Sequence, residues 1–219
     1  MQLETALSLN YLVREPKINT NNPSVIILIH GYGSNEQDLY SFANELPDEL
    51  LVISVRAPQT LAHGSYSWYT ISFDMDNGKF SDDDEALESR DLLVKFIGEI
   101  KERYAINNKV FLLGFSQGAI LSYAIAMKYP NQVNHIVALS GYVNLNIMPS
   151  KIDTEAVSKV DFFVSHGLVD QVIPLEWAQE TPKFLNDYNI EHIYKEYPVG
   201  HGVAPQNFYD FKDWILKRL

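Results

Sequence analysis

A Gly-x-Ser-x-Gly motif at residues 114–118 constrains this chain more than any other sequence feature. The apolar residues 110–113 precede it, and small and apolar residues follow it. This order predicts a buried strand, a sharp turn and a helix, with the hydroxyl of Ser116 exposed above a parallel sheet. Gly114 and Gly118 lie where the helix returns close to the strand, so a Cβ there would collide. We therefore expect Ser116 to be a nucleophile at a helix N-terminus.

Strand and helix patterns alternate along the rest of the chain. The five consecutive apolar residues at 25–29 predict a strand covered on both faces, as in a parallel sheet. We expect further strands at 7–13, 50–55, 133–139, 160–164 and 192–197, and helices from 34, from 81, after 174 and over 205–216. This alternation predicts an α/β fold with a doubly wound, mostly parallel sheet and helices on both faces. We expect residues 1–219 to form a single domain.

Three local patterns add detail to this prediction. Ser34–Gln37 has the Ser-x-x-Gln spacing of a capping box and predicts a helix start. Residues 56–80 show little regular pattern and predict a long connection, which is often functional in a compact domain. Pro182 falls inside a predicted helix and should kink or split it.

Composition excludes several classes of function. The formal net charge of -11 argues against binding of nucleic acid or anionic membranes through a basic surface. No apolar run approaches the roughly 18 residues that span a bilayer, and the first residues lack the pattern of a secretory signal. We therefore expect a cytoplasmic protein. The chain has no cysteine, which excludes disulfides, thiolate metal sites and a cysteine nucleophile. The oligomeric state stays open, a homodimer included.

A nucleophilic serine needs a base, and the base needs an orienting acid. In a strand–elbow–helix fold these follow in the order Ser…Asp/Glu…His, at the carboxyl ends of strands. His201 follows the last predicted strand between two glycines, and we predict that it is the base; the alternative is an exposed loop histidine. Asp170 follows the preceding strand, and we predict that it is the acid; the alternative is a capping or turn aspartate.

The reaction also needs donors for an oxyanion. We assign this role to the backbone N–H groups of Gln117, the residue after the nucleophile, and of Tyr32, in the loop after the 25–29 strand. Because main-chain groups donate, we expect both side chains to be free to vary. His30 is predicted to bond within its own loop. We expect neither cofactor nor metal, because a pair of His30 and His166 lacks a third ligand.

Four segments resemble the phospholipase/carboxylesterase family of α/β-hydrolases, which includes the acyl-protein thioesterases. They are residues 28–39, 114–119, 166–177 and 200–202. The resemblance implies an α/β-hydrolase fold and serine-dependent hydrolysis of carboxylic esters or thioesters with short to medium acyl chains, without cofactor or metal. It places Ser116, Asp170 and His201 on the catalytic triad and Tyr32 and Gln117 on the oxyanion hole. The short segment 142–158 cannot build a large cap.

The substrate is less constrained by the sequence. Trp68, Tyr69 and Phe73 lie in the long connection and are predicted to line an acyl groove, although packing of that loop onto the body explains them equally well. Oxygen esters, protein thioesters and lysophospholipids remain alternative substrates. A peptidase or a lactone hydrolase is a further alternative on the same fold. A non-catalytic binding module is the last, because fold alone does not establish activity.

Overall fold

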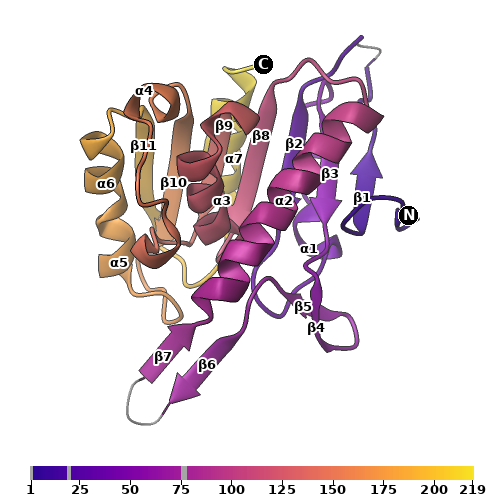
Figure 1. Cartoon of the computed structure of the whole chain (residues 1–219). Helices are drawn as coiled ribbons and strands as arrows, with labels where there is room; N and C mark the ends of the chain where they lie inside the picture. The colour runs from indigo at the N-terminus through magenta and orange to yellow at the C-terminus, as the bar shows by residue number, and fades with distance from the viewer. Residues whose placement is uncertain (1, 19–20, 75–77) are drawn as a thin grey trace.

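The computed structural model describes residues 2–18, 21–74 and 78–219, with only the backbone described at 73, 74 and 78–80. Its centre is a seven-stranded sheet with the order β1-β3-β2-β8-β9-β10-β11 (Figure 1). Edge strand β1 pairs antiparallel with β3, and all other neighbours in this sheet are parallel. The strands are β1 (Tyr11–Arg14), β2 (Val25–Ile29), β3 (Leu51–Val55), β8 (Val110–Phe115), β9 (His135–Leu139), β10 (Asp161–Gly167) and β11 (His192–Tyr197).

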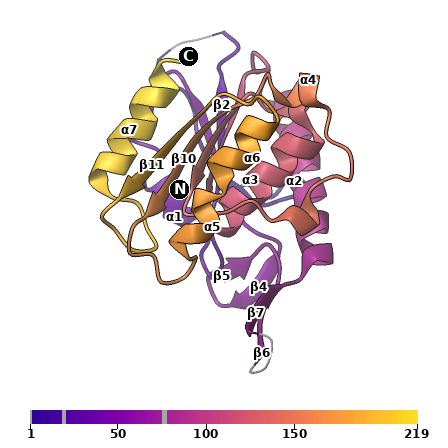
Figure 2. The ribbon, with the colours of Figure 1, turned by 90° about the vertical axis from the view of Figure 1, so that its left-hand side faces the viewer.

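Helices cover both faces of the sheet, as the sequence predicts (Figure 2). One face packs mainly against α2, α3 and α6, and the other packs against α1 and α7. The helices are α1 (Gln37–Tyr40), α2 (Asp83–Arg103), α3 (Gln117–Lys128), α4 (Thr154–Val157), α5 (Leu175–Gln179), α6 (Thr181–Asp187) and α7 (Pro205–Leu216), with 3₁₀ turns η1 (Pro130–Gln132) and η2 (Leu145–Ile147). Between β9 and β10 the described chain forms only η2 and α4, so the sheet carries no cap there.

The position of β2 between two helical layers explains why its run of apolar residues is uninterrupted. All five of its side chains are buried. Ile26 and Leu28 pack in the layer that contains α1 and α7. The alternate residues Val25, Ile27 and Ile29 pack in the layer with α2 and α3. Because successive strand side chains point to opposite faces, a strand between two helical layers needs an apolar residue at every position.

The turn from β8 into α3 depends on its glycines. A Cβ on Gly118 would overlap the backbone carbonyl of Ile29, and a Cβ on Gly114 would overlap the carbonyl of Gly118. Backbone atoms of a packed sheet and helix cannot move aside as a flexible side chain does. The predicted close approach of strand and helix is therefore confirmed.

We expect Gly118→Ala to lower the free energy of unfolding by about 3 kcal/mol or more, because the added methyl must push α3 off β2. Urea denaturation measures this effect. Gly98→Ala is the matched control, since a Cβ on Gly98 in α2 meets nothing within 4 Å and alanine is favoured in a helix interior by about 1 kcal/mol. Equal denaturation midpoints for Gly118→Ala and the wild-type protein would contradict this account of the turn.

Two local predictions are wrong. Residues 56–80 are not irregular, because they include the hairpins β4 (Gln59–Ala62) with β5 (Ser65–Ser67) and β6 (Ile71–Asp74) with β7 (Gly78–Ser81), which project from the carboxyl edge of the sheet (Figures 1 and 2). The capping box does not form, because the Ser34 hydroxyl bonds Asp38 while the Ser34 backbone pairs with Tyr66. The predicted split at Pro182 is confirmed: α5 ends at Gln179 and α6 starts at Thr181.

Candidate active site

Ser116 occupies a strained turn between β8 and α3. Its φ of 55° lies in the left-handed region, which a residue with a Cβ adopts only at a cost of about 1–3 kcal/mol. The backbone N–H of Ser116 donates to the carbonyl of Leu139 on β9 at 2.9 Å, which fixes the turn to the neighbouring strand. Helix α3 begins at the next residue, so the serine lies at the positive end of a helix dipole.

Asp170 and His201 come together at the carboxyl ends of β10 and β11. The Oδ2 atom of Asp170 lies 2.7 Å from Nδ1 of His201. The other carboxylate oxygen accepts the backbone N–H groups of Val172 and Ile173, at 2.8 and 3.0 Å. These contacts fix which oxygen faces the imidazole. The two residues were predicted from their order along the chain and their places after strand ends, and they are in direct contact although 31 positions separate them.

The environment of Asp170 keeps its carboxyl group ionised. Burial opposes the charge, but the N–H of Ile173, the ring of His201 and the N–H of Val172 outweigh it and hold the pKa below its usual value. An ionised carboxylate can only accept, so Nδ1 of His201 must carry the proton of their hydrogen bond. The lone pair of His201 is then on Nε2, which is the tautomer a general base needs.

His201 also lies beside the strained turn. Its ring packs against the ring of Phe115, the residue before Ser116, with 4.9 Å between the centroids. The structure gives no hydrogen bond between the Ser116 hydroxyl and His201, although both residues are described. Hydrogen bonds of this kind commonly tighten only when substrate is bound. Strand order and the aromatic contact thus place the imidazole of His201 beside the turn that carries Ser116.

Two backbone N–H groups belong to segments that contact Ser116. Gln117 is the first residue of α3, so its N–H has no partner within the helix. Tyr32 lies in the loop after β2, and its neighbour Gly31 packs against Ser116, since a Cβ on Gly31 would come 3.1 Å from that of the serine. Within the described residues, neither N–H donates a hydrogen bond. Unpartnered donors close to a serine suit an oxyanion.

The loop that carries Tyr32 is held by the first hairpin. Gly33 has a φ of 76° and donates its N–H to the carbonyl of Tyr66 at 2.8 Å. Behind it, the buried carboxylate of Glu36 accepts two bonds from the guanidinium of Arg56, at 2.6 and 2.7 Å. Burial raises the pKa of Glu36, but the bonds from Arg56 outweigh this and lower it overall. This ion pair was missed, because neither residue belongs to a motif whose order along the chain is known in advance.

Two buried histidines have structural hydrogen bonds. His30 bonds the carbonyl of Gly31 through Nδ1 at 2.7 Å and accepts the N–H of Ala57 at Nε2. Burial, the largest influence, lowers the pKa of His30, so the neutral ring fits the loop role predicted for it. His166 bonds the carbonyl of Ile173 through Nε2 at 3.0 Å. The residues that the structure describes contain no group of three or more metal-ligating side chains.

The side chain of Gln117 is not free to vary, contrary to the prediction. It is buried, its Oε1 accepts the N–H of Trp68 at 3.1 Å, and its Nε2 donates to the carbonyl of Tyr69 at 2.8 Å. Trp68 itself is fully buried and donates from its indole to the carbonyl of His30 at 2.9 Å. The prediction that Trp68 lines a groove is therefore wrong. Its ring packs the loop onto the body.

We expect Gln117→Leu to lower the free energy of unfolding by about 2 kcal/mol or more, because it leaves two buried backbone groups without partners. Thermal or urea denaturation measures the change. The control is Gln179→Leu, which removes a hydrogen bond from an exposed glutamine to Glu196 and should stay within about 0.5 kcal/mol. Equal losses in the two variants would show that the buried amide does not hold the loop.

A cavity of about 250 Å³ opens from Ser116. Tyr69 is one of its lining residues; Phe73 lies in β6, and its side chain is outside the described part of the structure. The sequence did not predict that the other residues line a cavity, because they come from separate parts of the chain, namely β6, β7, α2, α3, α5 and the loops after β9 and β10: Ile71, Ser81, Asp83, Gln117, Ile120, Tyr142, Asn144, Asn146, Ile173 and Trp177. No helix in the described part of the chain is long and apolar enough to cross a membrane.

Comparison with known proteins agrees with this geometry. A probable carboxylesterase of rice is 25% identical over 210 residues, which cover 90% of this chain and 79% of the relative. Acyl-protein thioesterase 1 of Cryptococcus neoformans is 25% identical over 236 residues, which cover 97% of this chain and 98% of the relative. Among solved structures, a carboxylesterase from Mesorhizobium loti has the same fold, with a TM-score of 0.82, 17% identity and 98% of both chains covered.

A second solved structure, a Bacillus cereus carboxylesterase, superposes with a TM-score of 0.81 at 21% identity over 96% of this chain and 95% of its own. These structural matches establish the α/β-hydrolase fold. The sequence profile of the phospholipase/carboxylesterase family matches residues 13–219, which is nearly the whole chain. The chain therefore belongs to the phospholipase/carboxylesterase family of hydrolases.

Proposed function

We propose that the protein is a serine esterase in which Ser116, His201 and Asp170 form the catalytic triad. The observation that carries the proposal is the 2.7 Å hydrogen bond between Asp170 and His201 beside the strained turn at Ser116. Family membership supports hydrolysis of esters as the reaction class. We further propose that the protein is cytoplasmic and that residues 1–219 work as one domain; the packing of both helical layers on a single sheet supports the single domain.

In the first half-reaction, Nε2 of His201 takes the hydroxyl proton of Ser116 as Oγ attacks the carbonyl carbon of the ester. The carbonyl oxygen becomes an oxyanion, which accepts hydrogen bonds from the N–H groups of Tyr32 and Gln117. Asp170 holds the imidazole in position and stabilises its positive charge. Collapse of the intermediate breaks the bond to the leaving alcohol or thiol, which receives the proton from His201. The acyl group stays on Ser116.

In the second half-reaction, water takes the place of the leaving group. His201 removes a proton from the water as its oxygen attacks the acyl carbonyl, and the same two N–H groups bind the new oxyanion. Breakage of the bond to Ser116 Oγ releases the carboxylic acid, and His201 returns the proton to the serine. Every proton that His201 takes is given back, so the cycle needs no group beyond the chain and water.

The cavity supports a short acyl chain. At about 250 Å³ it holds about eight water molecules at roughly 30 Å³ each. A second groove of about 360 Å³ adjoins it at Tyr142 and Trp177, so a medium-length chain would extend there. The alternative substrate is a thioester on a protein, which the likeness to acyl-protein thioesterase 1 over 97% of the chain favours.

The test is hydrolysis of p-nitrophenyl esters of two to twelve acyl carbons, paired with labelling by a fluorophosphonate. We expect turnover that peaks at a short to medium chain length and covalent labelling at Ser116. A parallel series of acyl thioesters separates the two substrate classes by their kcat/KM. Absence of both turnover and labelling in folded protein would overturn the proposal and favour a binding module.

A further inference from the structure

The cavity at Ser116 contains a carboxylate that the proposed reaction does not use. Asp83, at the start of α2, lines it together with Ser81, Asn144 and Asn146. The oxygens of Asp83 accept from the amide of Asn144 at 3.0 Å and from that of Asn146 at 2.9 Å. These partners are neutral, so they orient the carboxylate without cancelling its charge. A carboxylate has about four lone-pair sites, so capacity to accept a donor remains.

Aromatic rings line the same cavity. Tyr69, Tyr142 and Trp177 all border it, and the rings of Tyr142 and Trp177 meet edge to face with 5.0 Å between centroids. Burial raises the pKa of both tyrosines, and the charge of Asp83 raises it further, so the phenols stay neutral and lie within the field of that carboxylate. Aromatic faces attract cations, and quaternary ammonium groups in particular.

The position of the cavity shows which part of a substrate would enter it. His201 protonates the leaving group, so the leaving group must lie on the His201 side of Ser116. Ser116 and Gln117 line the cavity, whereas His201, a described residue, does not. The cavity thus reaches Ser116 without reaching His201, which suits the acyl portion, the part of the substrate that stays on Ser116 during the acyl-enzyme stage.

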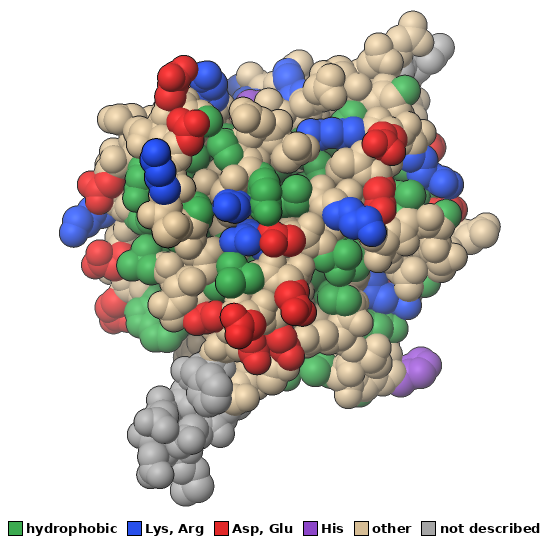
Figure 3. Space-filling model, in the orientation of Figure 1, with side chains coloured by type: hydrophobic (Ala, Val, Ile, Leu, Met, Phe, Trp, Pro, Cys, Tyr) green, Lys and Arg blue, Asp and Glu red, His purple; other side chains and the backbone are tan. Residues whose placement is uncertain are grey.

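We propose, on the basis of the proposed esterase function, that Asp83 and the three aromatic rings select substrates whose acyl portion carries an alkylammonium group. Asp83 supplies the charge and Tyr69, Tyr142 and Trp177 surround the alkyl groups. The net charge of -11 adds an attractive field for a cation. Figure 3 shows acidic side chains in red over the start of α2, whose first turn also contains Asp84 and Glu85.

The probes are two p-nitrophenyl esters of the same shape, one of 4-(trimethylammonio)butanoate and one of 5,5-dimethylhexanoate, with rates corrected for uncatalysed hydrolysis. We expect wild-type kcat/KM to be at least about tenfold higher for the cationic ester. Asp83→Asn, which keeps the shape and removes the charge, should lower this ratio about tenfold. The neutral ester, measured on the same variant, reports any change in the shape of the cavity, so the ratio isolates the effect of the charge.

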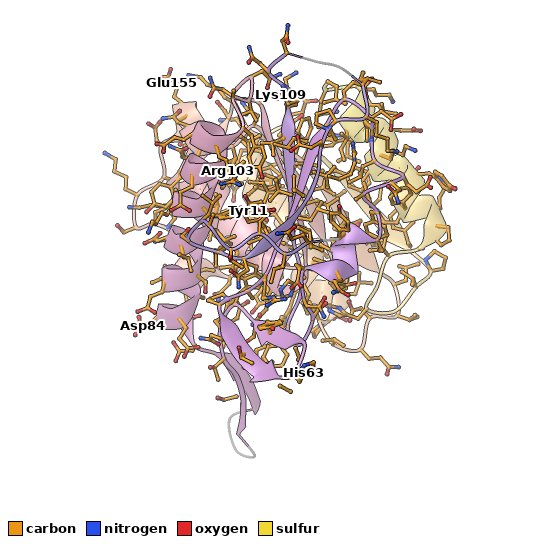
Figure 4. All side chains as sticks on the ribbon, turned by 90° about the vertical axis from the view of Figure 1, so that its right-hand side faces the viewer. Tyr11, His63, Asp84, Arg103, Lys109 and Glu155 are labelled. Atoms are coloured by element: carbon orange, nitrogen blue, oxygen red, sulfur yellow. The ribbon has the colours of Figure 1, made fainter. Side chains whose placement is uncertain are left out.

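Asp84→Asn is the matched control. Asp84 follows Asp83 in the same turn but is exposed (Figure 4), and its loss changes the net charge by the same amount. The ratio should stay at the wild-type value in this variant. A wild-type ratio near one, or an equal drop in the two variants, would overturn the proposal while leaving the esterase function in place. Failure of the wild-type protein to hydrolyse the neutral ester and the simple acyl series would instead overturn the esterase function.

A measurement on the wild-type protein alone tests the proposal even if Asp83→Asn does not fold. Butyltrimethylammonium should inhibit hydrolysis of p-nitrophenyl acetate competitively, while sodium at the same ionic strength should not. Equal effects of the two cations would contradict a cation site in the cavity.

Discussion

Ser116→Ala should lower kcat/KM for a p-nitrophenyl ester by about a millionfold and abolish labelling by a fluorophosphonate, because the variant has no atom to form the acyl-enzyme. Alanine tolerates the backbone of this turn about as well as serine does. The Ser116 hydroxyl makes no hydrogen bond with the described residues, so its removal leaves no partner unsatisfied. We therefore expect a thermal unfolding midpoint within a few degrees of wild type.

Ser140→Ala is the matched control for this change. Ser140 is a second buried serine that follows a strand of the same sheet, and its φ of 51° is close to the 55° of Ser116. This variant therefore measures the effect of removing a serine hydroxyl from such a turn while the nucleophile is kept. The control should keep activity within a few-fold of wild type. Retained turnover in a pure preparation of Ser116→Ala would move the nucleophile elsewhere.

The parts of this fold that could be predicted from sequence depend on local patterns with a single physical solution. Strand β2 has no exposed face, so every residue in it must be apolar and the apolar run marks both of its ends. Its bounds, Val25–Ile29, were therefore predicted correctly. Strand β11 and helix α7 also match the predicted 192–197 and 205–216. The turn at Ser116 belongs to the same group, because close backbone contact requires glycine at 114 and 118.

The errors arise where a distant part of the chain decides the outcome. Ser34 and Gln37 have the spacing of a capping box, but the backbone of Ser34 pairs with that of Tyr66, so the helix does not start there. Trp68 has the size of a groove-lining residue, but Gln117 and His30 hold its segment inside the body. Asp83 is one of several acidic residues at a helix start, and only the folded chain shows that it faces the cavity.

Asp170→Asn should lower kcat/KM by about four orders of magnitude, although it replaces one atom by another of similar size. The N–H groups of Val172 and Ile173 point at Oδ1, so the amide oxygen of an asparagine must take that place. Its NH₂ group then faces Nδ1 of His201. Two donors cannot share a hydrogen bond, so the imidazole must move its proton to Nε2. The lone pair that should accept the proton of Ser116 is thereby lost.

Asp161→Asn is the control for this substitution. Asp161 contacts Nδ1 of His135 at 2.5 Å and also pairs with Arg218, and it begins β10 at the opposite edge of the sheet from Asp170. The two variants thus remove the same charge from the same kind of pair. Asp161→Asn should lose stability but keep kcat/KM within about twofold, since its distance from the cavity leaves the chemistry unchanged.

The tautomer itself can be observed, which separates this explanation from simple loosening of the loop. NMR of the ring nitrogens should place the His201 proton on Nδ1 in the wild-type protein and on Nε2 in Asp170→Asn. The pKa of Asp170 lies below its ordinary value, so the hydrogen bond from the Nδ1 proton of His201 to an ionised carboxylate should persist down to the ordinary carboxyl range and be lost only as the pH falls further. A slow Asp170→Asn variant that keeps its proton on Nδ1 would show that Asp170 acts by position alone.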